Sequence, residues 1–274
     1  MGQQFSKVFK RIGSSHHSSS GAASGAASGA ASDSPLSDPS LPSGFRWQDG
    51  RGFKEEGNAA YPLPNDNDEL MRLNAQHYLI RYVLEGNQRA PVQGELKRGI
   101  KVLDAGCGTG VWSMRFHVPC FRKCEWPLAI QELIRVTKPG GWVELGMTKF
   151  DSQGIAFSTG PHTSEWFRQM VMMMSMRDVD MRWSSNFTRV FQECGLLDIM
   201  HDFRSLPVGW GPPEIAEPAG KNFLKVFVAF KPQMLIALGI DEEEYDKLVA
   251  ETEAELALFK TYWNVDYVYG RKPL

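Results

Sequence analysis

The chain lacks the features that mark membrane-spanning and secreted proteins. No apolar run approaches the roughly 18 residues that a membrane-spanning helix needs. Only four cysteines occur among 274 residues. They do not have the paired spacings of a disulfide framework, which indicates a reducing compartment. The amino terminus has no continuous apolar core of the kind that secretory signals carry, so we expect a cytoplasmic protein.

An excess of positive charge is also missing. The 30 lysines and arginines are balanced by 32 acidic residues, which gives a net charge of −2. Such a chain has no overall basic field to attract nucleic acid, so we expect no nucleic-acid partner. The content of 42% hydrophobic and 23% charged residues is typical of a soluble protein with one substantial domain.

A glycine-rich turn follows a short apolar run near the middle of the chain. Ile100 to Leu103 predict a buried parallel strand, with Asp104 at its carboxyl end. Glycines at positions 106, 108 and 110 then let the backbone approach a ligand, and a helix is expected to begin at the last of them. Nucleotide-type ligands are bound by such turns, although a strand-to-helix turn that binds nothing has the same pattern. The G-x-G-x-G spacing differs from the G-x-G-x-x-G of dinucleotide enzymes, which disfavours a nicotinamide-dependent oxidoreductase.

A helix, a turn and a strand are predicted between Trp126 and Leu145. The helix has one apolar face, and Pro139 and the two glycines after it end the helix before the strand begins at Trp142. The apolar face consists of Ile130, Leu133, Ile134 and Val136.

Together these motifs resemble the class I S-adenosylmethionine-dependent methyltransferases. The two ends of the domain look like the fungal LaeA and UMTA type of that class. The matching segments are Asn58–Asp66, Gln76-His77, Thr261-Tyr-Trp and Tyr269–Pro273. The resemblance spans roughly residues 45–274 and implies an α/β, Rossmann-like fold with three α/β/α layers.

The resemblance also implies a cofactor and a reaction. The cofactor is S-adenosylmethionine, and a methyl group is transferred to an unidentified small-molecule or protein nucleophile. Because the methyl donor is already activated, the protein mainly has to place the nucleophile in line with the methyl group and exclude water. No catalytic residue can be named. By resemblance Tyr61 lies over the cofactor pocket, and the other cofactor-binding residues are Asp104, Gly106, Cys107, Gly108, Thr109 and Gly110.

One part of the family pattern is missing. Only 27 residues lie between Gly110 and Lys138, whereas three further strands with their crossover helices would need on the order of 60–90 residues. We therefore expect an incomplete sheet without strands two to four, with the deletion near residues 116–126. In the family, the second strand carries the acid that binds the ribose. The alternative function is thus a catalytically inactive, truncated methyltransferase-like protein that acts by binding or has no function.

The segment at this gap contains three side chains that could ligate a metal, His117, Cys120 and Cys124. Zinc prefers four ligands in paired clusters, and the other two cysteines, Cys107 and Cys194, lie elsewhere. We expect no metal site.

The first twelve residues predict a membrane anchor. Met1 to Ser6 fits the acceptor pattern for myristate on Gly2, and an amphipathic stretch up to Ile12 follows, with apolar residues at helical spacing and three basic residues. An acyl chain and a basic patch together bind anionic membranes, so we expect membrane association. The alternatives are a chance match and a nuclear location.

Residues 13–44 contain a repeated Gly-Ala-Ala-Ser sequence, which predicts a disordered linker. Residues 45–274 are expected to form the methyltransferase-like domain.

The remaining elements follow from caps and periodicity. Asp66 as N-cap and Glu69 three residues later predict a capping box, and Gly86 ends that helix. His77 on its apolar face fits a core histidine better than a catalyst. Helices are predicted over 162–177, 184–194, 214–230 and 241–259, and strands over 197–205 and 261–270, which would form the reversed edge hairpin of the sheet. The methionines at 170–176 are expected to fill core gaps.

Overall fold

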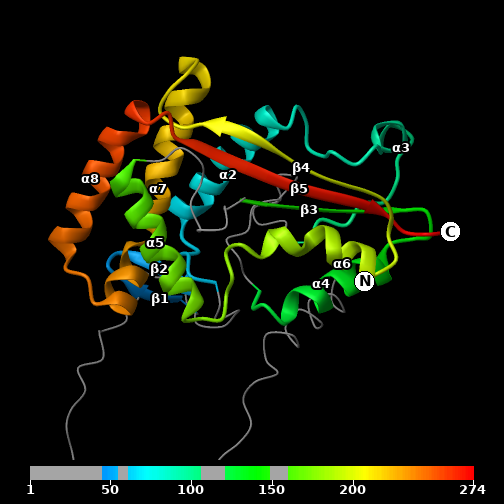
Figure 1. Ribbon diagram of the computed structural model, residues 1–274, viewed down its shortest axis with the longest axis horizontal. Helices are drawn as coiled ribbons and strands as arrows, with labels where there is room; N and C mark the ends of the chain where they lie inside the picture. The colour runs from blue at the N-terminus through cyan, green and yellow to red at the C-terminus, as the bar shows by residue number, and fades with distance from the viewer. Residues whose placement is uncertain (1–44, 55–60, 106–120, 149–159) are drawn as a thin grey trace, which may run out of the picture.

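The structure is a computed structural model that describes residues 45–54, 61–105, 121–148 and 160–274 (Figure 1). The anchor segment 1–12 and the linker 13–44 lie outside these residues. The elements are β1 (Phe45–Gln48), β2 (Arg51–Lys54), α2 (Asn67–Val83), α3 (Gln93–Lys97), α4 (Glu125–Val136), β3 (Trp142–Thr148), α5 (Pro161–Ser175), a 3-10 helix (Trp183–Asn186), α6 (Phe187–Glu193), β4 (Leu197–Pro207), α7 (Pro213–Leu238), α8 (Glu242–Leu258) and β5 (Tyr262–Arg271). No helix in these ranges is both long and apolar enough to cross a membrane.

The main sheet has three strands in the order β3-β5-β4. Both neighbours run antiparallel to β5, so β3 and β4 are parallel to each other. This confirms the predicted reversed hairpin of the last two strands, with α7 and α8 inserted between them. The α/β class is therefore correct, and the described part of the sheet is small.

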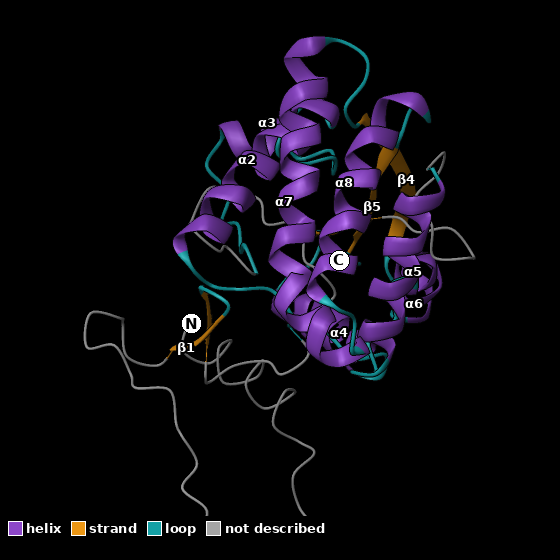
Figure 2. Ribbon diagram, turned by 90° about the vertical axis from the view of Figure 1, so that its left-hand side faces the viewer, coloured by secondary structure: helices purple, strands orange, loops and turns teal. Residues whose placement is uncertain are grey.

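Helices cover both faces of this sheet. On one face, Trp263, Val265 and Tyr267 of β5 belong to the larger apolar core, which is shared with α2, α5, α7 and α8. On the other face, Val268 belongs to a smaller core with α4 and α6. In Figure 1, α4 and α6 lie below the sheet, and α5, α7 and α8 gather at the end toward which β4 points. Figure 2 shows the long α7 beside α8.

The start of α2 confirms one half of the predicted capping box. The Asp66 carboxylate accepts a hydrogen bond from the Glu69 backbone N–H at 2.9 Å, as an N-cap does. The other half is wrong. The Glu69 side chain does not return to the cap but pairs with Arg72, because an opposite charge lies one helical turn away.

The start of α5 is capped by a different helix. Gly160 precedes α5 and offers no side chain of its own, and the buried Glu255 carboxylate of α8 takes its place. It accepts hydrogen bonds from the backbone N–H groups of His162 and Thr163 at 3.0 and 2.9 Å, and from the Thr163 hydroxyl at 3.1 Å. The imidazole Nδ1 of His162 lies 2.6 Å from the same carboxylate. These bonds join α5 to α8.

The methionine cluster packs as predicted. Met170, Met173 and Met174 of α5 are buried in the larger core, whereas Met172 and Met176 are exposed. The helix α7 is longer than predicted and ends at Leu238, because the left-handed Gly239 supplies its stop. Pro218 and Pro232 both lie inside it.

The hairpin of β1 and β2 was not predicted. Its turn is Asp49-Gly50, and both residues have positive φ angles of 48° and 71°. Such an Asp-Gly pair between two short strands is the usual signal for a tight hairpin turn, so the sequence did contain the evidence.

The predicted strand from Ile100 to Leu103 is wrong. The structure describes these residues but assigns no strand to them, and Val102 and Leu103 are 50% and 54% exposed. A central parallel strand needs neighbours on both edges to satisfy its backbone. The described sheet offers none to this segment. The predicted apolar face of α4 also needs a small correction, because Val136 is 39% exposed while Trp126 and Ala129 are buried.

Candidate functional site

Of the predicted cofactor-binding residues, the structure describes Tyr61 and Asp104. Asp104 is described and partly buried. Gly106, Cys107, Gly108, Thr109 and Gly110 lie outside the described residues, as do Gly2, His117 and Cys120. Cys124 is exposed. Within the described ranges, no group of three or more His, Cys, Asp or Glu side chains is placed to hold a metal ion.

Tyr61 lies at the start of the segment that leads into α2. Its ring is partly buried and packs against the larger core, and Leu63 two residues later is fully buried. Packing accounts for this position. A contact between Tyr61 and a cofactor stays a prediction.

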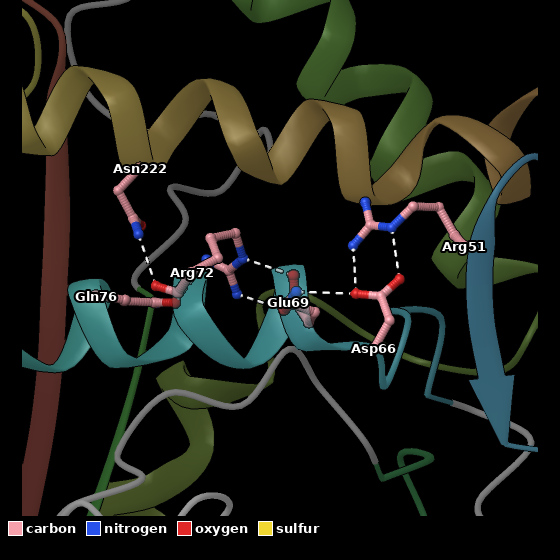
Figure 3. A network of polar contacts seen from close by, with 6 residues as sticks. All are labelled: Arg51, Asp66, Glu69, Arg72, Gln76 and Asn222. Carbon is pink, nitrogen blue, oxygen red and sulfur yellow. Dashed lines mark hydrogen bonds and ion pairs between the residues drawn. The ribbon is translucent and has the colours of Figure 1, made fainter. Parts of the chain in front are cut away.

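A chain of polar contacts runs from the hairpin along α2 to α7 (Figure 3). Arg51 of β2 forms a two-point ion pair with Asp66, at 2.6 and 3.0 Å. Burial acts to raise the pKa of Asp66. The hydrogen bonds from Arg51 and from the backbone of Glu69 and Gly52 outweigh it, so the pKa lies below its ordinary value. Asp66 thus fixes both the hairpin and the start of α2.

The next contacts in this chain are buried. Glu69 and Arg72 are 1% and 3% exposed and form a two-point ion pair at 2.7 and 2.8 Å. Arg72 also donates to Gln76 Oε1 at 2.8 Å, and its backbone carbonyl accepts from Asn222 Nδ2 of α7 at 2.8 Å. The ion pair lies within α2, and removing one member would leave an uncompensated buried charge. The bond from Asn222 to the Arg72 carbonyl is the contact that joins α2 to α7. The sequence motif that carried the resemblance here therefore has a structural role.

The loop after α2 is held on the sheet by one carboxylate. Glu144 of β3 accepts hydrogen bonds from the backbone N–H groups of Arg89 and Ala90, each at 2.9 Å. The Arg89 guanidinium lies over the Tyr267 ring of β5, 5.5 Å from its centre. This contact fixes the start of the segment that leads to Asp104.

The last motif of the resemblance is also structural. Lys272 donates to the carbonyls of Ile134 and Thr137 at the end of α4, each at 2.8 Å, where a cation suits the helix dipole. Gly270 lies against Phe191 and Leu196, and a Cβ at this position would approach them to 3.0 and 3.2 Å. The Tyr-Gly-Arg-Lys-Pro segment therefore closes the smaller core.

No sequence motif indicated a polar group on the face of the sheet that α4 and α6 cover. His201 of β4 lies between the buried Asp266 of β5, at 3.0 Å, and the Thr188 hydroxyl of α6, at 2.7 Å. On the same face of β5, Asn264 accepts from the Ser205 hydroxyl at 2.7 Å. The sequence signal for this group is that the polar residues Asn264 and Asp266 alternate with apolar residues along the buried strand β5. The group ties α6 to the sheet, on the face opposite to α2.

The exposed side of α2 carries an open depression. It is lined by Tyr78, Arg81, Tyr82, Glu85 and Gly86, and both tyrosines are exposed. His77 points to the other side and is buried, in keeping with a core histidine. The polar side chains that line this depression do not form a recognisable binding site for a ligand.

Comparisons with known proteins find three similar sequences, two of which are named methyltransferases. No family model matches the chain. It is similar to methyltransferase pytC of Aspergillus terreus, with 33% identity in an alignment of 261 positions. The alignment takes in 73% of this chain and 79% of the relative. A second pytC sequence of that species is 34% identical over 70 residues, which cover 26% of this chain and 21% of the relative. The secondary metabolism regulator laeA of Gibberella zeae is 29% identical over 80 residues, which cover 29% of this chain and 24% of that protein. The chain thus spans about a fifth to a quarter of two of these relatives.

Two solved structures show a weak likeness. Both are phosphoethanolamine N-methyltransferase 2 of Haemonchus contortus, one with phosphomonomethylethanolamine and S-adenosylhomocysteine and the other with S-adenosyl-L-methionine. The identities are 16% and 15% and the TM-scores 0.30 and 0.31. The matches cover 55% and 59% of this chain, and 31% and 34% of those chains.

Proposed function

Because the chain belongs to the methyltransferase family that includes pytC of Aspergillus terreus, we propose that it is an S-adenosylmethionine-dependent methyltransferase with a weakened cofactor site. The methyl acceptor is an unidentified small-molecule or protein nucleophile. The observation that carries the proposal is the 33% identity over 79% of the relative. The motifs at both ends of the domain support it.

The described residues fit the cofactor only in part. In the proposed site, Asp104 and the glycine turn at 106–110 hold the methionine end of S-adenosylmethionine. Asp104 is partly buried, as an orienting acid should be, but Val102 and Leu103 before it are exposed and form no strand. A ligand turn needs a rigid strand behind it.

The alignment supports the loss of the central strands. It runs over 261 residues of the relative but takes in 73% of this chain, and 73% of 274 residues is about 200. About 60 positions of the relative therefore have no residue here. That length matches the roughly 60–90 residues of three βαβ units. We propose that strands two to four, with the ribose-binding acid, are the missing part.

The second candidate function is that of an inactive relative that acts by binding. The exposure of Val102 and Leu103 favours it, because an unformed central strand leaves the cofactor turn without support. The two candidates differ in one measurable quantity, the affinity for the cofactor product.

Calorimetric titration with S-adenosylhomocysteine tests both candidates. Each charge-assisted hydrogen bond that is lost costs about 1.5–3 kcal/mol, so the loss of two weakens binding on the order of 100-fold or more relative to a full-length relative. Any residual binding should disappear in Gly108→Val, because a branched side chain occupies the space where the backbone meets the ligand. Undiminished binding in the folded variant would place the ligand elsewhere. A micromolar dissociation constant would contradict the proposed loss of strands, and no binding at all would favour the inactive relative.

We further propose that the protein is cytoplasmic and associates with anionic membranes through an acylated Gly2 and the basic residues up to Ile12. One acyl chain alone binds a membrane only marginally, and the basic patch supplies the second signal. The support is the sequence pattern. A nuclear location of the protein would contradict this proposed membrane association.

A further inference from the structure

The side chains of Thr188, His201 and Asp266 form one line of hydrogen bonds. His201 Nε2 lies 3.0 Å from Asp266 Oδ1, and His201 Nδ1 lies 2.7 Å from the Thr188 hydroxyl oxygen. Asp266 belongs to β5, His201 to the neighbouring strand β4, and Thr188 to the first turn of α6. A hydroxyl, an imidazole and a carboxylate therefore follow one another in this order.

The carboxylate decides where the imidazole carries its proton. Asp266 is 1% exposed, and an ionised carboxylate accepts hydrogen bonds but has none to donate. A neutral His201 therefore carries its proton on Nε2, which donates to Asp266. The lone pair of Nδ1 then faces Thr188, whose hydroxyl donates the hydrogen bond between them.

This arrangement makes a weakly nucleophilic hydroxyl reactive. A base within about 2.6–3.2 Å takes the proton as the oxygen attacks, and a third group holds the base in the correct tautomer. Both distances of His201 fall within this range. In serine hydrolases the carboxylate faces Nδ1 and the hydroxyl faces Nε2. Here the two nitrogens are exchanged, but the three roles are the same.

The line of side chains reaches the surface at its hydroxyl end. The side chain of Asp266 is 1% exposed and that of His201 is 23% exposed, and Thr188 is half-buried. Phe203, two residues after His201 on the same face of β4, is 37% exposed and offers an apolar surface beside the imidazole. A small ester with an apolar acyl group suits these surroundings.

We propose that Thr188 is a nucleophile for esters, with His201 as its general base and Asp266 as the residue that positions His201. The Thr188 oxygen attacks the carbonyl carbon of the ester while its proton passes to His201 Nδ1. The same proton goes to the departing alcohol as the bond from carbon to that alcohol breaks, which leaves an acyl ester on Thr188. Water attacks this acyl ester in the same way and releases the carboxylic acid.

Labelling with a fluorophosphonate tests for the activated hydroxyl, because this probe is attacked by a hydroxyl that a neighbouring base activates. The native full chain should displace fluoride and gain a phosphonyl group on Thr188. Tryptic digestion should place this group in the peptide of residues 183–189, and fragment ions distinguish Thr188 from Ser184 and Ser185. A native chain without an adduct on Thr188 would overturn the proposal.

Four variants separate reactivity from folding. Thr188→Val should give no adduct, whereas Thr188→Ser keeps the hydroxyl and should be labelled at least as fast as the parent. His201→Gln keeps polar groups but has no base, so labelling should slow by about 100-fold or more. Ser205→Ala is the matched control, because Ser205 lies in the same polar region but bonds to Asn264. Its labelling rate should equal that of the parent.

Each variant is compared with the parent after circular dichroism has shown that it is folded. A folded His201→Gln chain that is labelled as fast as the parent would contradict the proposal and leave the imidazole with its role of joining α6 to the sheet. Labelling of the urea-unfolded chain at the native rate would contradict it as well. These readouts involve neither cofactor nor methyl transfer, so their failure is distinct from failure of the proposed function.

Discussion

Replacement of Glu255 by glutamine tests how two helices far apart in the sequence are joined. The Glu255 carboxylate is 6% exposed and accepts from two backbone N–H groups and one hydroxyl at the start of α5, as described above. Glutamine keeps the shape of the side chain, but its NH₂ group faces the donors of Thr163. One or two hydrogen bonds to a charged acceptor are lost, at about 1.5–3 kcal/mol each. We expect the free energy of unfolding to fall by about 2–4 kcal/mol.

The effect should also depend on pH. Burial acts to raise the pKa of Glu255, but the hydrogen bonds from His162 and Thr163 hold it below its ordinary value of 4.5. A carboxyl with a depressed folded-state pKa stabilises the fold above its unfolded pKa, and this stabilisation is lost as the pH falls through the folded pKa. The difference between the parent and Glu255→Gln should therefore be constant near neutral pH. It should shrink as the pH falls below about 4.5.

The assay is urea unfolding followed by tryptophan fluorescence, since Trp166 of α5 is buried beside α8 and donates to Tyr245. Glu253→Gln is the matched control, because Glu253 lies on the same helix and is exposed; we expect a change within about 0.5 kcal/mol. The reasoning is refuted if Glu255→Gln behaves like this control, or if the difference stays the same at acid pH.

Three further predictions concern Gly160, the segment at Val102 and Leu103, and the amino terminus. Gly160→Ala should destabilise the fold by about 1–3 kcal/mol, because the added methyl would collide with the Glu255 carboxylate; an unchanged urea midpoint would show that α8 can move aside. The double variant Val102→Ser, Leu103→Asn should lower the free energy of unfolding by less than about 0.5 kcal/mol per site, because both side chains are exposed. A loss of several kcal/mol in the same assay would show that these residues are buried, as in the predicted strand. Gly2→Ala should shift a fluorescent fusion from membranes to the cytosol, as should charge reversal of the basic residues Lys7, Lys10 and Arg11; a parent fusion that is already diffuse or nuclear would contradict the anchor.

Elements with local signals were predicted well. The helix α2 begins at the predicted Asp66 cap, and α4 ends before the predicted proline and glycines. The pattern of apolar residues also predicted β3, β4 and β5, and the family resemblance implied the antiparallel hairpin of the last two. These signals lie within a few residues of the structure that they specify, so the chain does not have to be folded to read them. The hairpin turn at Asp49-Gly50 has the same kind of local signal.

The sequence by itself indicated the α/β class and the family, and it predicted that the central strands are missing. It could not decide whether Ile100 to Leu103 form a strand, because a strand exists only with neighbours that complete its hydrogen bonds. Nor could it reveal that Glu255 caps α5 from 92 and 93 residues away, or that Glu144 holds the loop at Arg89. A carboxylate finds such partners only when packing brings distant backbone N–H groups to it. Tertiary structure alone decided those contacts.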